Sequence, residues 1–176
     1  CDYSISENKV ALQATDEAQP GYFSTNQPDA DRPYNQIEKA IDGNSTSFFM
    51  SNRSNNANTK EYHHLKVDLG SDTKAKTPMF SMIGHISWNY ATSVKIYGSN
   101  NNKTWTNVAT IDGISINYSS ELIRSNTAYR YWRFDVTSTT GRYEDNSEYP
   151  WFTVKEFEFF NAVENIENKP GFEKIS

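Results

Sequence analysis

Residues 40–49, Ala-Ile-Asp-Gly-Asn-Ser-Thr-Ser-Phe-Phe, decide the fold when they are taken together with residues 154–160, Val-Lys-Glu-Phe-Glu-Phe-Phe, near the other end of the chain. The first stretch is an Asp-Gly turn rich in oxygen donors and closed by two aromatic residues. The second is a strand that carries a carboxylate between apolar side chains. A turn that folds its carbonyls and hydroxyls around one point, completed by a distant Glu, predicts a calcium-type site. If the two stretches meet there, the chain is one closed domain whose ends lie close together.

Alternation of polar and apolar residues recurs along the chain and predicts an all-β fold. It is cleanest at residues 93–98, and the remaining expected strands are residues 66–70, 82–88, 104–111, 129–136 and 153–160. Helical signal is nearly absent, with one or two turns expected at residues 34–41. Many short strands separated by polar loops indicate an antiparallel sandwich of the jelly-roll type.

The length of 176 residues fits one domain. We expect an N-terminal tether at residues 1–7, the β-sandwich at residues 8–161 and a polar tail or linker at residues 162–176. Aromatic residues make up 14% of the chain, enough to fill a core and also to offer stacking surfaces. The net charge of -5 argues against nucleic acid or an anionic lipid surface as the partner, because both favour a basic face.

The chain has one cysteine, Cys1, so it can form no internal disulfide or cysteine metal site. A first residue that is also the only Cys predicts a bacterial lipoprotein, lipid-anchored through Cys1 at the cell surface or outer membrane, and otherwise a secreted protein. The alternative is an arbitrary start of the chain. No apolar run approaches the ~20 residues of a membrane helix, so any membrane contact is expected through that anchor alone.

Five short motifs resemble, in order, those of discoidin domains, also called coagulation factor V/VIII type C domains. Residues 40–49 resemble the family's "A-[LI]-D-G-[ND]-x-x-T-x-W" turn, and Val67-Asp68-Leu69-Gly70 resembles its "V-D-L-G". The others are residues 94–105, 129–134 and 154–159, and the series covers roughly residues 8–161. The resemblance implies a galactose-binding-like β-sandwich of about eight antiparallel strands.

Two departures from the family pattern lie in the turn itself, where Ser47 replaces a Thr and Phe49 replaces a Trp. Ser47 keeps the hydroxyl and Phe49 keeps an aromatic plug for the core, so we expect the turn to survive. The clotting members close their ends with a disulfide and bind membranes through basic, apolar loops. One cysteine and an acidic balance fit neither property. The chain is therefore most similar to the bacterial sugar-binding branch, carbohydrate-binding module family 32.

The resemblance implies a structural Ca2+ held by oxygen atoms from both ends of the domain. Its ligands would be the Lys39 carbonyl, the Asp42 carboxylate, the Asn44 carbonyl, the Ser47 hydroxyl and carbonyl, and the Glu156 carboxylate. Such a closed oxygen cage leaves no position for a substrate. The alternative is a metal-free turn in which Glu156 accepts backbone N–H bonds.

Glycan recognition combines an aromatic surface with a few placed polar groups, and in this fold the loops at one end of the sandwich supply them. The ligand-binding candidates are Asn52, Arg53, Tyr90, Arg142, Tyr149 and Trp151, with Asn55, Tyr143, Tyr22 and Phe23 as further loop residues. Trp151 has an alternative role as a cap on the core. Galactose-binding members often carry Tyr-x-Pro-Arg after the strand that ends here at Trp88, and this chain has Asn-Tyr-Ala-Thr instead. The ligand therefore differs from galactose, or the site has been lost.

Nothing in the sequence assembles a general acid and base. His63 and His64 are adjacent, so in a strand they face opposite sides, and no nucleophile, zinc or phosphate-loop motif occurs. We therefore expect no enzyme activity. The sequence favours a non-catalytic carbohydrate-binding module that binds a mono- or oligosaccharide. The alternative is a protein–protein adhesion or assembly module that uses the same loops.

Overall fold

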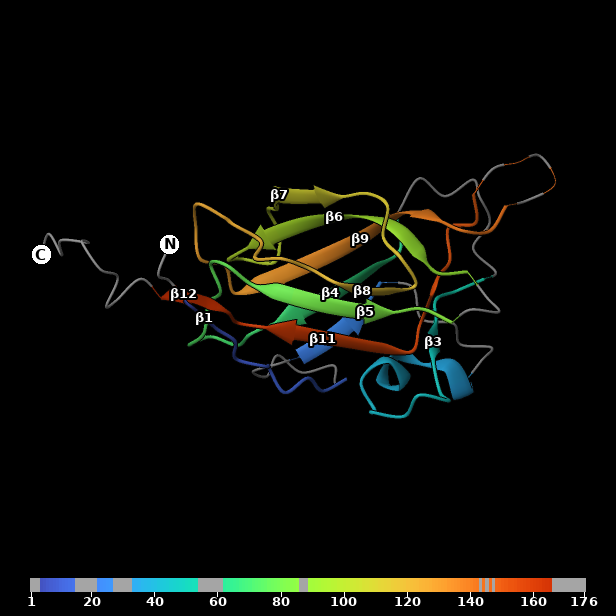
Figure 1. Ribbon diagram of the computed structural model, residues 1–176, viewed down its shortest axis with the longest axis horizontal. Coiled ribbons are helices and arrows are strands. Elements are labelled where there is room, and N and C mark those ends of the chain that lie inside the picture. The colour runs from blue at the N-terminus through green and yellow to red at the C-terminus, as the bar shows by residue number, and fades with distance from the viewer. Residues whose placement is uncertain are drawn as a thin grey trace, which may run out of the picture.

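The computed structural model describes residues 4–14, 22–26, 33–53, 62–85, 89–142, 144, 146 and 148–165, and the regular structure within them is almost entirely β-strand (Figure 1). The strands are β1 (Ser4–Ser6), β2 (Tyr22–Thr25), β3 (Phe49–Met50), β4 (His64–Asp68), β5 (Met79–Ile83), β6 (Ala91–Ser99), β7 (Thr106–Ile111), β8 (Asn117–Ser119), β9 (Tyr131–Thr139), β10 (Thr153–Val154), β11 (Glu156–Phe160) and β12 (Val163–Asn165). Two 3-10 helices, η1 (Pro33–Asn35) and η2 (Ile37–Ala40), lie between β2 and β3. None of the helices in the described ranges is long and apolar enough to cross a membrane. Cys1, the expected anchor position, lies outside these ranges.

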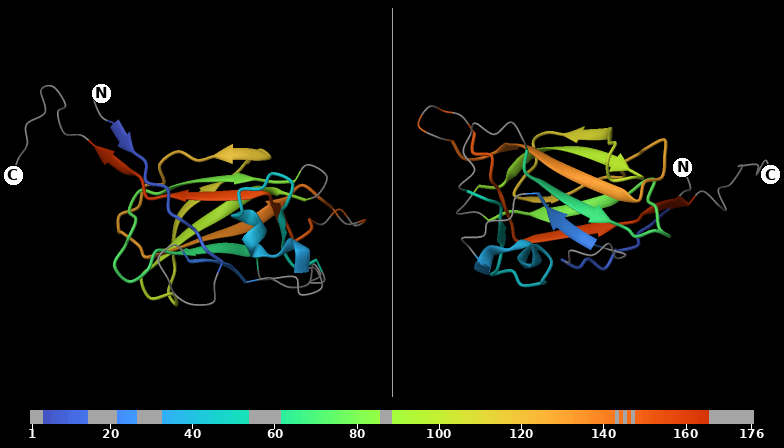
Figure 2. Two further views of the ribbon diagram at one scale, coloured as in Figure 1. Left: turned by 90° about the horizontal axis from the view of Figure 1, so that it is seen from below. Right: turned by 180° about the vertical axis from the view of Figure 1, so that it is seen from behind.

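Two antiparallel sheets form the two layers of the molecule. One has five strands in the order β2-β4-β9-β6-β7, and the other has three in the order β11-β5-β8. β5 and β11 lie in front of the five-stranded sheet in Figure 1, and the view from behind shows that sheet's outer face (Figure 2). The all-β antiparallel sandwich predicted from the alternation pattern is confirmed.

The core lies between the two sheets and is largely aromatic. Phe134 on β9 packs against Phe80 on β5 and Phe157 on β11, with ring centroids 4.9 and 5.3 Å apart. Phe157 and Phe159 are fully or almost fully buried, whereas Glu156 and Glu158 alternate with them on the other face of β11. Phe157 and Phe159 therefore point into the core. Each such ring buries about 150–250 Å² of surface, and together these rings hold the two sheets in one relative position.

The bounds of the expected strands differ from those observed, most clearly in two of them. The strand expected at residues 82–88 begins earlier, at Met79, and ends at Ile83. The next residue, Gly84, lies against Tyr90, and a Cβ on residue 84 would sit 2.3 Å from the Tyr90 Cβ. The last expected strand, residues 153–160, is interrupted at Lys155, so that β10 pairs with β3 while β11 pairs with β5.

The aromatic pair Tyr22 and Phe23 lies on β2 and not in a loop, so the loop assignment was wrong. Phe23 has no exposed surface and stacks on Phe157 with centroids 5.1 Å apart. The sequence pattern did not reveal β2, because Tyr22 and Phe23 are only two aromatic residues within a polar stretch. Phe23 is thus a core residue.

The described ends of the chain pair with each other. β1 and β12 form an antiparallel ribbon that projects from one end of the sandwich, at the left of Figure 1. Arg124 donates two hydrogen bonds to Glu164, of 2.6 and 3.2 Å, and so attaches β12 to the preceding loop. Residues within the expected tether and tail therefore form strands, and the ends lie close together as the sequence suggested.

Two adjacent histidines at the start of β4 face opposite sides, as alternation requires. His63 is fully buried, and His64 lies on the outer face with Asp135, Arg133 and Lys66 around it. Burial lowers the pKa of His64 to about 3, and the charges of Arg133 and Lys66 act in the same direction. Asp135 is 3.8 Å from the ring, but both of its oxygens accept hydrogen bonds from Arg133. Because Arg133 already neutralises Asp135, this carboxylate does not stabilise a positive charge on His64. His64 therefore stays uncharged.

A neutral, buried His64 makes the stability of the domain dependent on pH. The unfolded chain protonates this residue below its ordinary pKa of 6.5, whereas the folded chain does so only near 3. Stability contributed by His64 is therefore complete above pH 6.5 and is lost as the pH falls through that window. We expect His64→Gln to reduce the loss between pH 7 and about pH 5 by about 1–2 kcal/mol. Urea denaturation at both pH values measures this, and an identical pH dependence in the two proteins would contradict it.

Candidate functional site

The Asp42 turn follows directly from the local sequence after η2. Gly43 has φ +70°, a conformation that glycine adopts at little cost. The Asp42 carboxylate accepts hydrogen bonds from the Asn44 N–H at 3.0 Å and from the Ser47 hydroxyl at 2.5 Å. The Ser47 N–H in turn donates to the Asn44 carbonyl at 3.3 Å. The turn is therefore closed around the Asp42 carboxylate.

Glu156 approaches this turn from β11. Burial raises the pKa of Glu156, and the neighbouring Asp42 carboxylate raises it further. Partial burial also acts to raise the pKa of Asp42, but hydrogen bonds from Ser47 and Asn44 and the charge of Lys39 outweigh it and lower the pKa. The opposite shifts are those of two carboxyl groups that share one site and cannot both ionise at no cost.

The donor set at this turn fits a hard cation. It combines two carboxylates, the Ser47 hydroxyl and the carbonyl of Asn44, all of them oxygen ligands. The Glu156 Oε1 atom is buried and has no hydrogen-bond partner in the described part of the chain. No three His, Cys, Asp or Glu side chains converge among the described residues, so an ion here would depend on hydroxyl and backbone oxygens as well. The structure thus brings Asp42, Asn44, Ser47 and Glu156 together.

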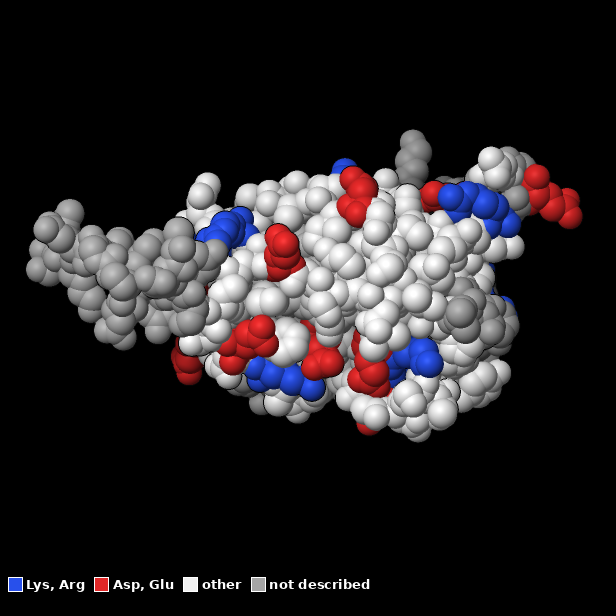
Figure 3. All heavy atoms as spheres, viewed as in Figure 1, with Lys and Arg blue, Asp and Glu red and all other residues white. Residues whose placement is uncertain are grey.

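Lys39 acts on this turn through its ammonium charge, and a ligand role for its carbonyl stays a prediction. Figure 3 shows Asp and Glu side chains grouped with basic ones along β11 on this face of the molecule. Lys9 and Glu158 form a salt bridge at 2.9 Å. A cavity of about 390 Å³ lies beside the turn, between the segment from Lys9 to Leu12 and β11.

The end-loop candidates come together around Trp151. The Arg53 guanidinium lies 5.7 Å from the centroid of the Trp151 ring, and the Tyr149 ring centroid lies 5.3 Å from it at an interplanar angle of 32°. Trp151 is only 8% exposed, so its indole supports its two neighbours from below the surface. Arg53 and Tyr149 are half-buried, and they carry the accessible part of this cluster. We call Arg53, Tyr149 and Trp151 the end-loop cluster.

Backbone pairing between the two chain segments holds the end-loop cluster in place. β3 pairs with β10, and beyond it the Ser51 N–H donates to the Phe152 carbonyl at 3.0 Å. The Ser51 hydroxyl accepts the Phe152 N–H at 3.0 Å and lies 2.7 Å from His63 Nδ1. Sequence reasoning missed this buried Ser51–His63 pair, although the polar Ser that follows two apolar strand residues was a signal for it.

The other candidates frame the same end of the molecule. The Thr140 N–H donates to the Tyr90 carbonyl at 3.2 Å, and the Thr139 hydroxyl donates to the Tyr149 carbonyl at 2.7 Å. Arg142 is exposed and forms a salt bridge with Glu148 at 3.1 Å. These contacts connect the loop after β9 to the residues that precede β6.

Close packing under this loop has a specific cause at Gly141. A Cβ there would lie 1.9 Å from Asn89 Oδ1 and 2.4 Å from Tyr149.

Asn52 is half-buried beside Arg53, but Asn55, Tyr143 and Trp88 lie outside the described residues. Arg53, Tyr149 and Trp151 are therefore brought into contact, and Tyr90 and Arg142 are attached to them through the backbone.

Solved structures share this fold. The chain aligns with a chitosan-binding module of a chitosanase/glucanase from Paenibacillus sp. IK-5 at TM-score 0.60 and 19% identity, covering 88% of this chain and 99% of that one. It aligns with the family 32 carbohydrate-binding module of Clostridium perfringens NanJ, solved with galactose, at TM-score 0.55 and 16% identity, covering 79% and 92%. The module of AlyQ, in complex with 4,5-unsaturated mannuronic acid, gives TM-score 0.56 and 14% identity, covering 88% and 98%. No curated protein matches the chain in sequence.

The family is shown by sequence as well as by fold. The profile of the F5/8 type C domain matches residues 13–156, which include the Asp42 turn, all five strands of the larger sheet, β5 and β8 of the smaller one, and Glu156 at the start of β11. The resemblance inferred from the five motifs is confirmed. The chain belongs to the F5/8 type C, or discoidin, domain family.

Proposed function

We propose that this domain is a non-catalytic module that binds glycans through the end-loop cluster. The observation that carries the proposal is the contact of Arg53 and Tyr149 with the largely buried Trp151 ring. The buried indole contacts both side chains, so that an aromatic surface and a charged donor lie against the same ring. That combination suits a sugar ring, which has an apolar C–H face and a rim of hydroxyl groups.

The ligand class is supported by what similar structures hold. Modules of this fold have been solved with galactose, with 4,5-unsaturated mannuronic acid and with GalNAc-beta-1,3-galactose. These ligands differ in charge and substitution, and the identities to this chain are low. We therefore propose a glycan ligand whose identity is set by this chain's own loops, where Tyr90 and Arg142 flank the cluster.

We also propose a structural Ca2+ at the Asp42 turn. Asp42, Asn44, Ser47 and Glu156, with the Lys39 carbonyl, would hold it. The paired carboxylates and the orphaned Glu156 Oε1 support this proposal. A bound cation supplies the positive charge that lets both carboxylates ionise in one site. Its role is to join β11 to the turn and not to contact a ligand.

Removing a ring or a charge from the end-loop cluster is the direct test of glycan binding. We expect Tyr149→Ala and Arg53→Ala each to weaken binding by about tenfold or more, equivalent to about 1.4 kcal/mol. The reason is that each loses a contact surface while Trp151 keeps the fold closed. A glycan array identifies the ligand, and isothermal titration calorimetry measures the affinity.

The matched control is Tyr34→Ala, because Tyr34 is a 64% exposed tyrosine on η1. It should bind as the wild type does. Unchanged affinity in Tyr149→Ala and Arg53→Ala would overturn the assignment, as would no binding to any glycan at millimolar concentration. Selective binding to a protein in place of glycans would favour the adhesion alternative.

Calcium should stabilise the domain against heat. At a Ca2+ concentration of about a hundredfold above Kd, binding contributes about 2.7 kcal/mol, which corresponds to a rise in Tm of about 5–10 °C for a domain of this size. Chelation should reverse the rise in the wild type. Differential scanning fluorimetry with and without chelator measures it.

Glu156→Gln should abolish this calcium-dependent rise. The matched control is Glu158→Gln, which removes the same charge from the same face of β11 but pairs with Lys9 and not with the turn. Glu158→Gln should keep the calcium response. An equal Tm with calcium and with chelator in the wild-type protein would contradict the proposed ion.

A further inference from the structure

The outer face of the five-stranded sheet is a second organised surface, separate from the end loops. On β9, Tyr131, Arg133 and Asp135 point outward and alternate with the buried Trp132 and Phe134. The view from behind shows this face with no described helix or strand lying over it (Figure 2). Residues on neighbouring antiparallel strands are paired across this sheet, so their outward side chains lie next to one another.

Arg133 is the centre of this face. Its cross-strand neighbours are Lys66 on β4 and Tyr97 on β6. The guanidinium carbon lies 4.6 Å from the centroid of the Tyr97 ring and 4.6 Å from that of Trp105. Nε and Nη2 donate to the two oxygens of Asp135 at 2.8 and 3.2 Å. Two rings and a bidentate carboxylate therefore fix the orientation of this arginine.

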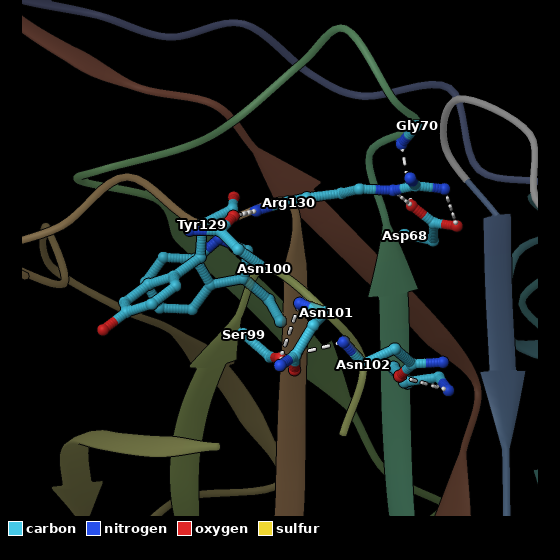
Figure 4. Close-up of polar contacts among 10 residues, drawn as sticks. Asp68, Gly70, Ser99, Asn100, Asn101, Asn102, Tyr129 and Arg130 are labelled. Carbon is cyan, nitrogen blue, oxygen red and sulfur yellow. Dashed lines mark hydrogen bonds and ion pairs between the residues drawn. The ribbon is translucent and has the colours of Figure 1, made fainter. Parts of the chain in front are cut away.

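Arg130 repeats the arrangement at the end of the same face. Its Nε and Nη2 donate to Asp68 at 2.7 and 3.1 Å, as Figure 4 shows, and the guanidinium lies 4.7 Å from the centroid of the Tyr131 ring. The Asp68 carboxylate is itself held by the Gly70 N–H at 2.8 Å. An edge contact between Trp105 and Tyr131, at 6.5 Å, connects the two arginine sites. We call Tyr97, Trp105, Arg130, Tyr131 and Arg133 the sheet-face cluster.

Each arginine keeps one side of its guanidinium group for a further partner. Nη1 of Arg130 and Nη1 of Arg133 donate to no acceptor among the described residues, while Nε and Nη2 are engaged. About a fifth of each side chain is exposed, 22% and 21%. The surface therefore offers donors whose positions are fixed in advance by the ion pairs behind them. Such pre-organisation lowers the entropy that a ligand loses on binding.

The charge of this face is opposite in sign to that of the chain. It carries four cations, Lys66, Lys95, Arg130 and Arg133, against two carboxylates, Asp68 and Asp135, so two positive charges remain uncompensated. The whole chain has a net charge of -5. Burial lowers the pKa of Lys66 and Arg133 acts in the same direction, although Asp68 opposes them. An anion at this face would relieve that repulsion.

We propose that the sheet-face cluster, with Lys66 and Lys95, is a second carbohydrate-binding surface that takes an acidic glycan bearing carboxylate or sulfate groups. The two lysines supply the net attraction, and the Nη1 atoms of the arginines supply directed hydrogen bonds to the anionic group. Tyr97, Trp105 and Tyr131 supply partly exposed ring surface for the apolar side of the sugar.

The test compares two double variants that remove the same charge from different places. Lys66→Gln/Lys95→Gln acts on the sheet face, and Lys74→Gln/Lys76→Gln acts on exposed lysines in the connection between β4 and β5. Polygalacturonate, a sulfated galactan and a neutral galactan are titrated into each protein by isothermal titration calorimetry. Polygalacturonate and the sulfated galactan separate carboxylate from sulfate recognition.

We expect the wild type to bind one or both acidic polymers, more weakly as salt is added. The sheet-face double variant should lose about tenfold in affinity, the control double variant much less, and Trp105→Ala should also weaken binding. Tyr149→Ala on the end loops should leave this binding unchanged, which separates the inference from the proposed function. Equal losses in the two double variants, equal loss in Tyr149→Ala, or no binding to either acidic polymer would each overturn it.

Discussion

Two carboxylates far apart in the sequence, Asp42 and Glu156, meet at one point, and the two chain segments that carry them also carry the end-loop cluster. Like charges this close need a shared proton or a cation, as their opposite pKa shifts indicate. The segments that carry them are the same ones that form the β3–β10 pair. Along the first segment the order is Asp42, β3, Arg53, and along the second it is Trp151, β10, Glu156. The β3–β10 pair therefore has the carboxylates at one end and the end-loop cluster at the other.

The β3–β10 pair connects the Asp42 turn to the end-loop cluster. β3 and β10 are two residues long each, and two-stranded pairs of this length have little stability of their own. Contacts at both of their ends compensate, through the Asp42 turn on one side and the buried Ser51–His63 pair on the other. The sheet-face cluster is different, because three of its residues lie on the long strands β6 and β9 and the other two directly precede β7 and β9. The two surfaces can therefore be altered independently.

The sequence predicted the features that depend on local patterns. Alternation revealed the strands, and the motif order placed Asp42 opposite Glu156, because the family resemblance supplied a contact that neither stretch encodes alone. Features that depend on packing were less accessible. The burial of Trp151 follows from its contacts with Arg53 and Tyr149, and the break at Lys155 arises because β10 and β11 have different partners. Two further features depend on how distant strands are paired, and the composition of the chain does not reveal such pairing. They are the pairing of β1 with β12 and the placement of Arg133 between two rings.

The claim on which this account most depends is that a cation bridges Asp42 and Glu156. Native mass spectrometry of protein exchanged into a calcium-containing volatile buffer measures the bound ion directly. We expect one calcium per chain in the wild type and in Glu158→Gln, and none in Glu156→Gln. A wild-type chain without calcium, or a Glu156→Gln chain that retains it, would contradict the account.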